Sequence, residues 1–226
     1  MDVVFSREPF PERVVKTLFL AGPTPRGGNA PSWRPQALET LREIGFSGTV
    51  FVPEDRDFIP PVSLDGNAQI TWERRCLAAS DRILFWLPRS DALPGFTTNI
   101  EFGAWANSGK IVVGIPPEAA KCGYIRHVCK ERGIACHAAL EGALEKAVAE
   151  IGEGAAREGW QAHIPFDVFT SPQFREHLAE LPGKPATLRM EMRHKIPCGG
   201  LVWLAVGVST GPDGEAIPAE MLGMSG

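Results

Sequence analysis

The sequence has little that would indicate a secreted, membrane-bound or nucleic-acid-binding protein. Its 226 residues include 23 Lys and Arg against 27 Asp and Glu, and the formal net charge of −4 offers no long-range attraction for a polyanion. No apolar run approaches the roughly 18 residues that a membrane span needs, and the N-terminus lacks a basic segment followed by an apolar stretch. We therefore predict a cytoplasmic protein whose partners include neither nucleic acid nor a membrane.

Cysteines are also few, and their spacing does not suggest a disulfide framework or a metal site. The five cysteines include no C-x-x-C pair. Cys122, Cys129 and Cys136 recur every seven residues, which is the spacing of side chains on one face of a helix. We expect free, mostly buried thiols, and neither a metal nor another cofactor.

Several common catalytic motifs are absent. The sequence contains no Walker A loop, no G-x-G-x-x-G fingerprint and no Gly-x-Ser-x-Gly elbow, and its five histidines all lie in the later half of the chain. What it has in abundance is 24 Gly and 20 Pro, beside a single Tyr. This composition indicates sharply bounded elements joined by short loops.

The order of apolar segments predicts an α/β fold. Short apolar runs alternate with segments of helical spacing, which is typical of a doubly wound parallel sheet with helices on both faces. The predicted strands are 17–21, 49–52, 82–87 and 111–115, with a short edge strand at 133–135, and the predicted helices are 33–44, 69–79, 100–107, 121–131 and 137–151. We expect four or five strands in one domain, residues 1–152.

The pattern changes from residue 153 onward. Residues 160–181 carry Pro165 and Pro172 and are followed by Pro182, 187–193 and 201–209 are predicted to be an antiparallel pair or two edge strands, and 211–214 is a turn. Residues 153–226 are therefore predicted to form a small β-containing appendage.

Two loops follow the first and third predicted strands and should lie side by side, because doubly wound sheets bind ligands outside the carboxyl ends of their strands. The first loop, 22–28, contains three glycines and Arg26, and the second spans 88–99. Exposed backbone N–H groups and a fixed charge can hold a phosphate or a sugar hydroxyl. The alternative is that loop 22–28 is a proline-rich connector that only turns the chain.

Glu101 is the most informative single residue. It lies in the first turn of a helix expected to open after residues 97–99, between Ile100 and Phe102, which should face the core. The helix dipole would favour an ionised carboxylate there, ready to act as a nucleophile or base. The alternative is an ordinary capping box with Thr98 as the N-cap.

A second carboxylate, Glu73, lies beside Trp72 on the predicted helix 69–79. Paired carboxylates suit glycosidic bond cleavage, in which one attacks the sugar carbon and the other assists the leaving group. An indole ring can stack on a planar base. The alternative is a surface Glu73 paired with Arg74 or Arg75, next to a Trp72 that packs in the core.

Four segments together carry a family resemblance: Phe19-Leu20-Ala21-Gly22-Pro23, Trp72-Glu73 ahead of Ser80-Asp81, Thr98 to Ala104, and Ser108-Gly109-Lys110. In order and spacing they resemble the nucleoside 2-deoxyribosyltransferase-like family, over roughly residues 17–150. The resemblance implies a compact flavodoxin-like fold. It also implies a homodimer or higher homo-oligomer, in which one subunit completes the site of another.

The resemblance further implies roles for individual residues. Glu101 would attack C1′ of a nucleoside or nucleoside 5′-monophosphate to form a glycosyl-enzyme ester, which a second base or water would resolve with net retention. Glu73 would position the sugar or base and transfer a proton. The residues assigned to substrate binding are Phe19, Gly22, Pro23, Thr24, Arg26, Gly27, Trp72, Arg89, Asn99 and Ser108.

The chain departs from the family pattern at two positions. The family's usual tyrosine at the end of the first strand is Phe19 here, and the aspartate that several transferases place six residues before the nucleophile is Gly95. These departures bear more on transfer to a second base than on cleavage of the glycosidic bond. The alternative to an enzyme is a non-catalytic nucleotide sensor or interaction module, and the presence of both Glu73 and Glu101 favours the enzyme.

Some relatives hydrolyse nucleoside 5′-monophosphates and receive the phosphate on a glycine-rich loop that residues 26–28 resemble. If Arg26 contacts the phosphate, Arg26→Ala should weaken binding of a nucleoside monophosphate far more than binding of the matching nucleoside. Calorimetric titration of both ligands measures this difference. Equal losses for the two ligands would rule out a phosphate contact.

Overall fold

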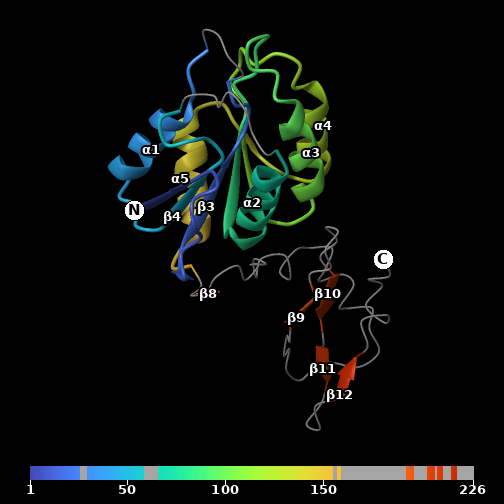
Figure 1. Ribbon diagram of the computed structural model, residues 1–226. Coiled ribbons are helices and arrows are strands. Elements are labelled where there is room, and N and C mark those ends of the chain that lie inside the picture. The colour runs from blue at the N-terminus through green and yellow to red at the C-terminus, as the bar shows by residue number, and fades with distance from the viewer. Residues whose placement is uncertain are drawn as a thin grey trace. The chain divides into compact units, whose positions relative to one another are not determined.

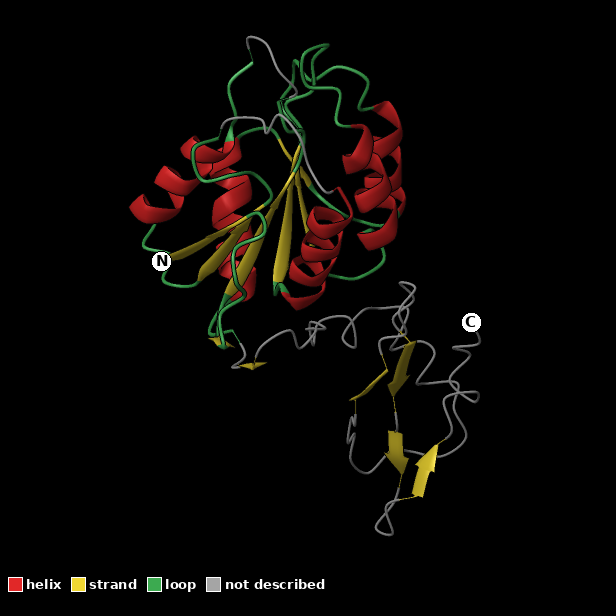
Figure 2. Ribbon diagram, viewed as in Figure 1, coloured by secondary structure: helices red, strands yellow, loops and turns green. Residues whose placement is uncertain are grey.

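The computed structural model describes residues 1–25, 30–58 and 66–154, with short strands at 157–158, 192–195, 203–206, 208–210 and 215–217. The chain forms two compact units, Met1–Pro165 and Phe166–Gly226. In the first unit, a six-stranded sheet is covered by helices on both faces (Figures 1 and 2). This arrangement confirms the α/β fold that the sequence predicts.

All neighbouring strands of this sheet pair in parallel. In spatial order they are β1 (Asp2–Phe5), β4 (Thr49–Val52), β3 (Thr17–Ala21), β5 (Arg82–Trp86), β6 (Ile111–Gly114) and β7 (Cys136–His137). The helices are α1 (Arg34–Glu43), α2 (Gly66–Ala79), α3 (Phe96–Trp105), α4 (Gly123–Glu131) and α5 (Leu140–Ile151). The sequence reading missed β1, and the edge strand lies at 136–137 instead of 133–135.

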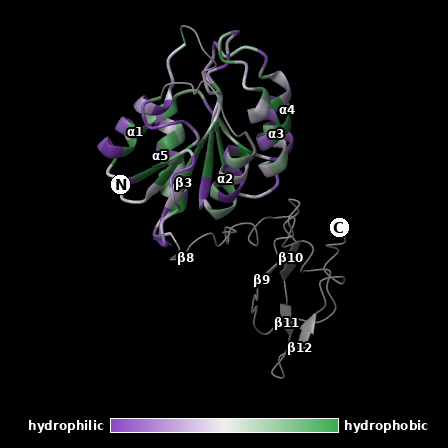
Figure 3. Ribbon diagram, in the orientation of Figure 1, coloured by the Kyte–Doolittle hydropathy of each residue, from purple (hydrophilic) through white to green (hydrophobic). Residues whose placement is uncertain are grey.

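The strands are apolar on both sides, so the sheet separates two hydrophobic layers (Figure 3). Along β3, Leu18 and Leu20 face one layer while Phe19 and Ala21 face the other, because successive strand residues point to opposite faces. Helices α1 and α5 fill the first layer, and α2, α3 and α4 fill the second. Burial on both faces explains why the strands read as continuous apolar runs.

This topology has a switch point between β3 and β5. The chain leaves β3 toward α1 on one face of the sheet and leaves β5 toward α3 on the other. Ligands of open α/β sheets bind at such a point, outside the carboxyl ends of the strands. We call the loops 22–25 and 87–95 together the β3–β5 edge.

Two glycines let the loops of the β3–β5 edge approach each other closely. A Cβ on Gly22, whose φ is +151°, would lie 2.2 Å from the backbone oxygen of Trp86. A Cβ on Gly95, whose φ is +61°, would lie 2.8 Å from the ring of Pro23. The prediction that the two loops lie side by side is therefore confirmed.

Short antiparallel pairs complete the described chain. In the first unit β2 (Arg13–Val14) pairs with β8 (Arg157–Glu158), so this unit extends past the predicted domain boundary at 152. In the second unit β9 (Met192–Lys195) pairs with β10 (Trp203–Val206), and β11 (Val208–Thr210) pairs with β12 (Glu215–Ile217). The turn at 211–214 and the segment 160–181 lie outside the described residues. None of the helices that the structure describes is long and apolar enough to cross a membrane.

Substitution of Gly22 tests the close contact between the two loops. Gly22→Ala is expected to lower the free energy of unfolding by roughly 3–5 kcal/mol, because the methyl group would overlap a backbone oxygen and the backbone angle is unfavourable. Gly45→Ala is the matched control: its φ is +74°, but no atom lies within 4 Å of the added Cβ. That variant should lose only about 1–2 kcal/mol in urea unfolding. Equal losses would mean that space at Gly22 is not limiting.

Candidate active site

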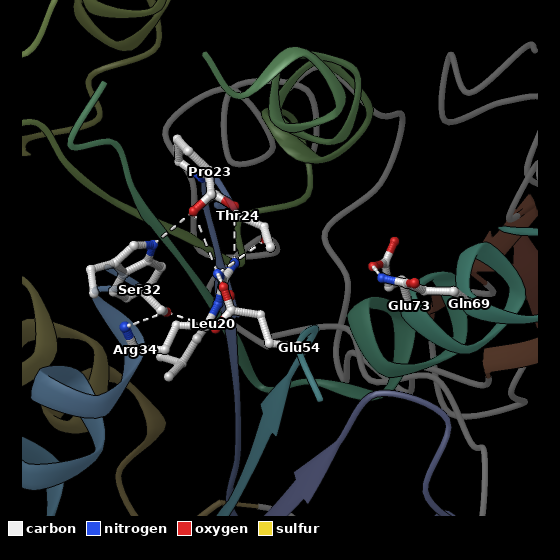
Figure 4. Close-up of polar contacts among 10 residues, drawn as sticks. Leu20, Pro23, Thr24, Ser32, Arg34, Glu54, Gln69 and Glu73 are labelled. Atoms are coloured by element: carbon white, nitrogen blue, oxygen red, sulfur yellow. Dashed lines mark hydrogen bonds and ion pairs between the residues drawn. The ribbon is translucent and has the colours of Figure 1, made fainter. Parts of the chain in front are cut away.

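A fully buried arginine, Arg34, lies against the loop 22–25 of the β3–β5 edge (Figure 4). Its Nη1 donates to Glu54 Oε1 at 2.7 Å, forming an ion pair whose side chains are 0% and 5% exposed. Its Nε donates to the carbonyl of Leu20 at 3.0 Å, and its Nη2 donates to that of Gly22 at 2.9 Å. The guanidinium thus joins the start of α1, the end of β3 and the second residue after β4.

Further contacts hold the loop after β3 against this ion pair. Arg34 Nη1 also reaches the hydroxyl of Thr24 at 3.2 Å and the carbonyl of Pro23 at 3.5 Å. The indole N–H of Trp33 donates to the same Pro23 carbonyl at 3.1 Å. Three of the residues that the sequence assigns to substrate binding, Gly22, Pro23 and Thr24, are therefore brought together here. Arg26 and Gly27 lie outside the described residues.

Ser32 connects the helix start to the ion pair. Its hydroxyl donates to Glu54 Oε2 at 2.6 Å and accepts the backbone N–H of Arg34 at 3.1 Å. The N-cap position itself is taken by Trp33, whose side chain makes no capping bond. The sequence predicted a helix start at this place but gave no role to Arg34 or Glu54.

Glu73 on α2 and Glu101 on α3 lie close enough for their charges to interact, and both interact with the charge of Arg34. Gln69, one turn before Glu73, donates its amide N–H to Glu73 Oε1 at 2.9 Å (Figure 4). The two carboxyl groups and the guanidinium come from three different helices. The two residues that the sequence singled out as a carboxylate pair are therefore within electrostatic range of each other.

Burial governs the protonation of both carboxyl groups. The pKa of Glu101 is raised to about 7, mainly by burial and then by the negative charge of Glu73, against a lowering by Arg34. Burial also raises the pKa of Glu73, while the hydrogen bond from Gln69 and the charge of Arg34 lower it. Such a pair can hold a proton at neutral pH, and perturbed carboxyl groups of this kind concentrate at functional sites.

The predicted first-turn position of Glu101 is wrong. Helix α3 begins at Phe96 after a left-handed Gly95 that makes no side-chain capping bond, so Glu101 lies in the second turn. The expected ionisation by the helix dipole is outweighed by burial, and Thr98 is inside the helix and not its N-cap. Phe102 faces the core as predicted, but Ile100 is 75% exposed, because only one side of the helix faces the sheet.

Two residues assigned to substrate binding are core residues instead. Phe19 is fully buried within β3. Trp72 is also buried, packs edge-on against Phe51 and donates its indole N–H to the carbonyl of Glu8 at 3.0 Å. For Trp72 the alternative of a core residue holds, so its ring is occupied by packing and has no free face for a base.

The remaining assigned residues are divided between two ends of α3. Arg89 is buried and donates to the side-chain oxygen of Asn99 and to the carbonyl of Lys121, so Arg89 and Asn99 form one contact near α4. Ser108 follows the other end of α3, where its hydroxyl donates to the carbonyl of Trp105 at 2.7 Å. That end leads into the start of β6, away from the carboxyl edge of the sheet, so Ser108 is a helix-end residue and not part of this site.

The cysteines do not form a metal centre in the part of the chain that the structure describes, where no group of three or more His, Cys, Asp or Glu could hold a metal ion. Cys122 and Cys129 are buried, while Cys136 is exposed in β7. The predicted shared helix face is therefore wrong for Cys136.

The family comparison agrees with this geometry. Residues 15–119 match the model of the family described as nucleoside 2-deoxyribosyltransferase like. This match confirms the resemblance for the N-terminal part of the chain, and it covers Arg34, Glu54, Glu73 and Glu101. It supports an enzyme of the glycosyl-transferring kind that binds a small-molecule nucleoside. No curated protein is significantly similar to the chain.

The raised pKa of Glu101 predicts a stability cost that a substitution should remove. Between its ordinary value of 4.5 and about 7, the folded state holds more protons at Glu101 than the unfolded state, so the free energy of unfolding falls as pH rises. At pH values above this range, the free energy of unfolding of Glu101→Gln should therefore exceed that of the unsubstituted protein by roughly 1–3 kcal/mol. At pH values well below the range, the two proteins should be equally stable.

Urea unfolding at a series of pH values measures this gain. Glu145→Gln on α5 is the matched control, because Glu145 is an exposed helix residue on the opposite face of the sheet. A gain that is independent of pH, or shared by the control, would contradict a buried carboxyl at Glu101.

Proposed function

We propose that this protein cleaves the N-glycosidic bond of a nucleoside or nucleoside 5′-monophosphate, with Glu101 as the nucleophile. The (deoxy)ribosyl group then passes to water or to a second base. The observation that carries the proposal is the pair of partly buried carboxyl groups, Glu101 and Glu73, facing the charge of Arg34 beside the switch point of the sheet. The family match supports the same class of chemistry.

The reaction has two steps with a covalent intermediate. In the first, the ionised Glu101 carboxylate attacks C1′, the bond to the base nitrogen breaks, and the base leaves with the bonding electrons and a proton from Glu73. In the second, water attacks C1′, its proton goes to Glu73, and the ester to Glu101 breaks. Two inversions give net retention at C1′. If a second base replaces water, the same step is a transfer.

The two carboxyl groups suit these complementary roles. A nucleophile must be ionised and a general acid must be protonated, and a mutually repelling pair holds one proton more readily than none or two. Because the negative charge of Glu73 raises the pKa of Glu101, this proton lies mainly on Glu101 in the free site, and the proposed attack requires that it pass to Glu73. The reaction should therefore slow as pH rises above about 7, the pKa of Glu101, where the pair loses its proton. Phe19 and Gly95, which stand where many relatives have a tyrosine and an aspartate, favour water as the acceptor.

The cytoplasmic location and the association into a homodimer or larger assembly stay predictions. The exposed side of α3 carries Phe96 and Ile100, which are 69% and 75% exposed.

Incubation with a panel of nucleosides and nucleoside 5′-monophosphates, with and without a second base, tests the function by chromatography. Free base without an acceptor indicates hydrolysis, and exchange that requires the acceptor indicates transfer. Glu101→Gln should lower kcat by roughly 1,000-fold or more, and Glu145→Gln should leave it unchanged.

Mass spectrometry of the denatured protein after rapid quenching should find the sugar attached to Glu101. Full activity of Glu101→Gln would refute its role as nucleophile. A ligand that raises the melting temperature but is never consumed would favour the nucleotide sensor instead.

A further inference from the structure

The buried pair of Arg34 and Glu54 is an unexpected feature for a merely structural contact. Desolvating two charges is unfavourable, and neutral groups of similar size often stabilise a protein equally well. Yet this pair lies at the carboxyl end of β3, beside the switch point of the sheet, and both side chains are at most 5% exposed. A second pair, of buried Arg82 and partly exposed Glu150, joins β5 to α5, which covers the opposite face of the sheet from α2 and α3.

The guanidinium of Arg34 is held in one orientation. Arginine has five N–H donors in a rigid plane, and those of Arg34 contact three carbonyls, one hydroxyl and one carboxylate. Arginine keeps its positive charge even where burial lowers its pKa, as it does here, and Glu54 offsets that effect. The result is a fixed charge that cannot turn away from its surroundings.

This charge interacts with the two proposed reacting groups. Two charged groups change the pKa of Glu101. Glu73 on α2 raises it, and Arg34 on α1 lowers it. Arg34 is affected in turn by Glu54, Glu101 and Glu73. Three carboxyl groups thus interact electrostatically with one guanidinium, and only that of Glu54 contacts it. Without that guanidinium, no positive charge among these interacting groups would oppose protonation of Glu101.

We propose that Arg34 is a positioning residue with two tasks: it holds the loop after β3 in place, and it keeps the Glu101 carboxylate available for attack. Glu54 orients Arg34 and moderates its charge. This inference rests on the proposed function of Glu101 as a nucleophile.

Charge and loop anchoring can be separated by two substitutions of Arg34. Arg34→Gln removes the charge but keeps amide donors for the nearby carbonyls. Arg34→Lys keeps the charge but loses the planar set of donors. Loosening of the site alone would admit water and lower the pKa of Glu101, so a rise in the uncharged variant must come from the lost charge.

Carbon-13 NMR of side-chain-labelled glutamate, with Glu101 assigned through Glu101→Gln, measures this pKa without any substrate. Arg34→Gln should raise the pKa of Glu101 by roughly one pH unit, because the positive charge that lowers it is lost. Arg34→Lys should not raise it. Glu54→Gln should lower it, because the charge of Arg34 is then less compensated. Arg82→Gln, the matched control, should not change it.

Kinetics on the same variants test the anchoring of the loop. Arg34→Lys should lose roughly 10-fold or more in kcat/KM without a shift of the alkaline limb of its pH profile, because the loop is held less well. Arg34→Gln should lose activity and also move that limb to higher pH. Arg82→Gln should keep both kcat/KM and the pH profile.

An unchanged or lowered pKa of Glu101 in Arg34→Gln would overturn the inference. If Arg34→Gln does not fold, an unchanged or raised pKa of Glu101 in Glu54→Gln would also overturn the inference. Failure of the proposed function looks different: the unsubstituted protein would release no base from any substrate, while the NMR pattern would still support the electrostatic role of Arg34. Base release with an unshifted pKa in Arg34→Gln would refute only the role of Arg34.

Discussion

The buried ion pair of Arg34 and Glu54 is the interaction on which the rest of the site depends. It joins three places that are separate in the sequence: the end of β3, the start of α1 and the second residue after β4. Removing one partner of such a pair costs about 3–5 kcal/mol, because the other charge is left buried and unpaired. The pair is therefore a condition for the shape of the β3–β5 edge and for the charge that Glu101 experiences.

The site combines groups that are individually unfavourable. Glu101 and Glu73 are partly buried, repel each other, and have raised pKa values. A protein selected only for stability would place amides or apolar side chains at these positions. Two carboxyl groups with raised pKa values beside a fixed guanidinium are typical of a site whose reaction needs charge at a defined place.

Local patterns predicted the elements whose signals are local, and missed those that depend on the assembled fold. The runs at 17–21 and 49–52 were read correctly because apolar residues are bounded by Gly, Pro or polar residues. The start of α3 was misplaced because a left-handed Gly95 opens it without a side-chain cap. Arg34 was overlooked because a charged residue at a helix start usually faces water, whereas here its partners lie 10 to 20 residues away. Glu54 could have been found, since it follows a predicted strand at the edge where ligands bind.

The contact between Gly22 and Trp86, and that between Gly95 and Pro23, has a consequence for how the protein can evolve. Gly22 lies against the end of β5 and the ring of Trp33, Gly95 lies against the ring of Pro23, and neither glycine can acquire a side chain without displacing these neighbours. Selectivity for one substrate over another therefore cannot be adjusted at this contact by ordinary substitutions. Changes in the ligand preference of this protein are therefore expected at the more exposed positions around the contact.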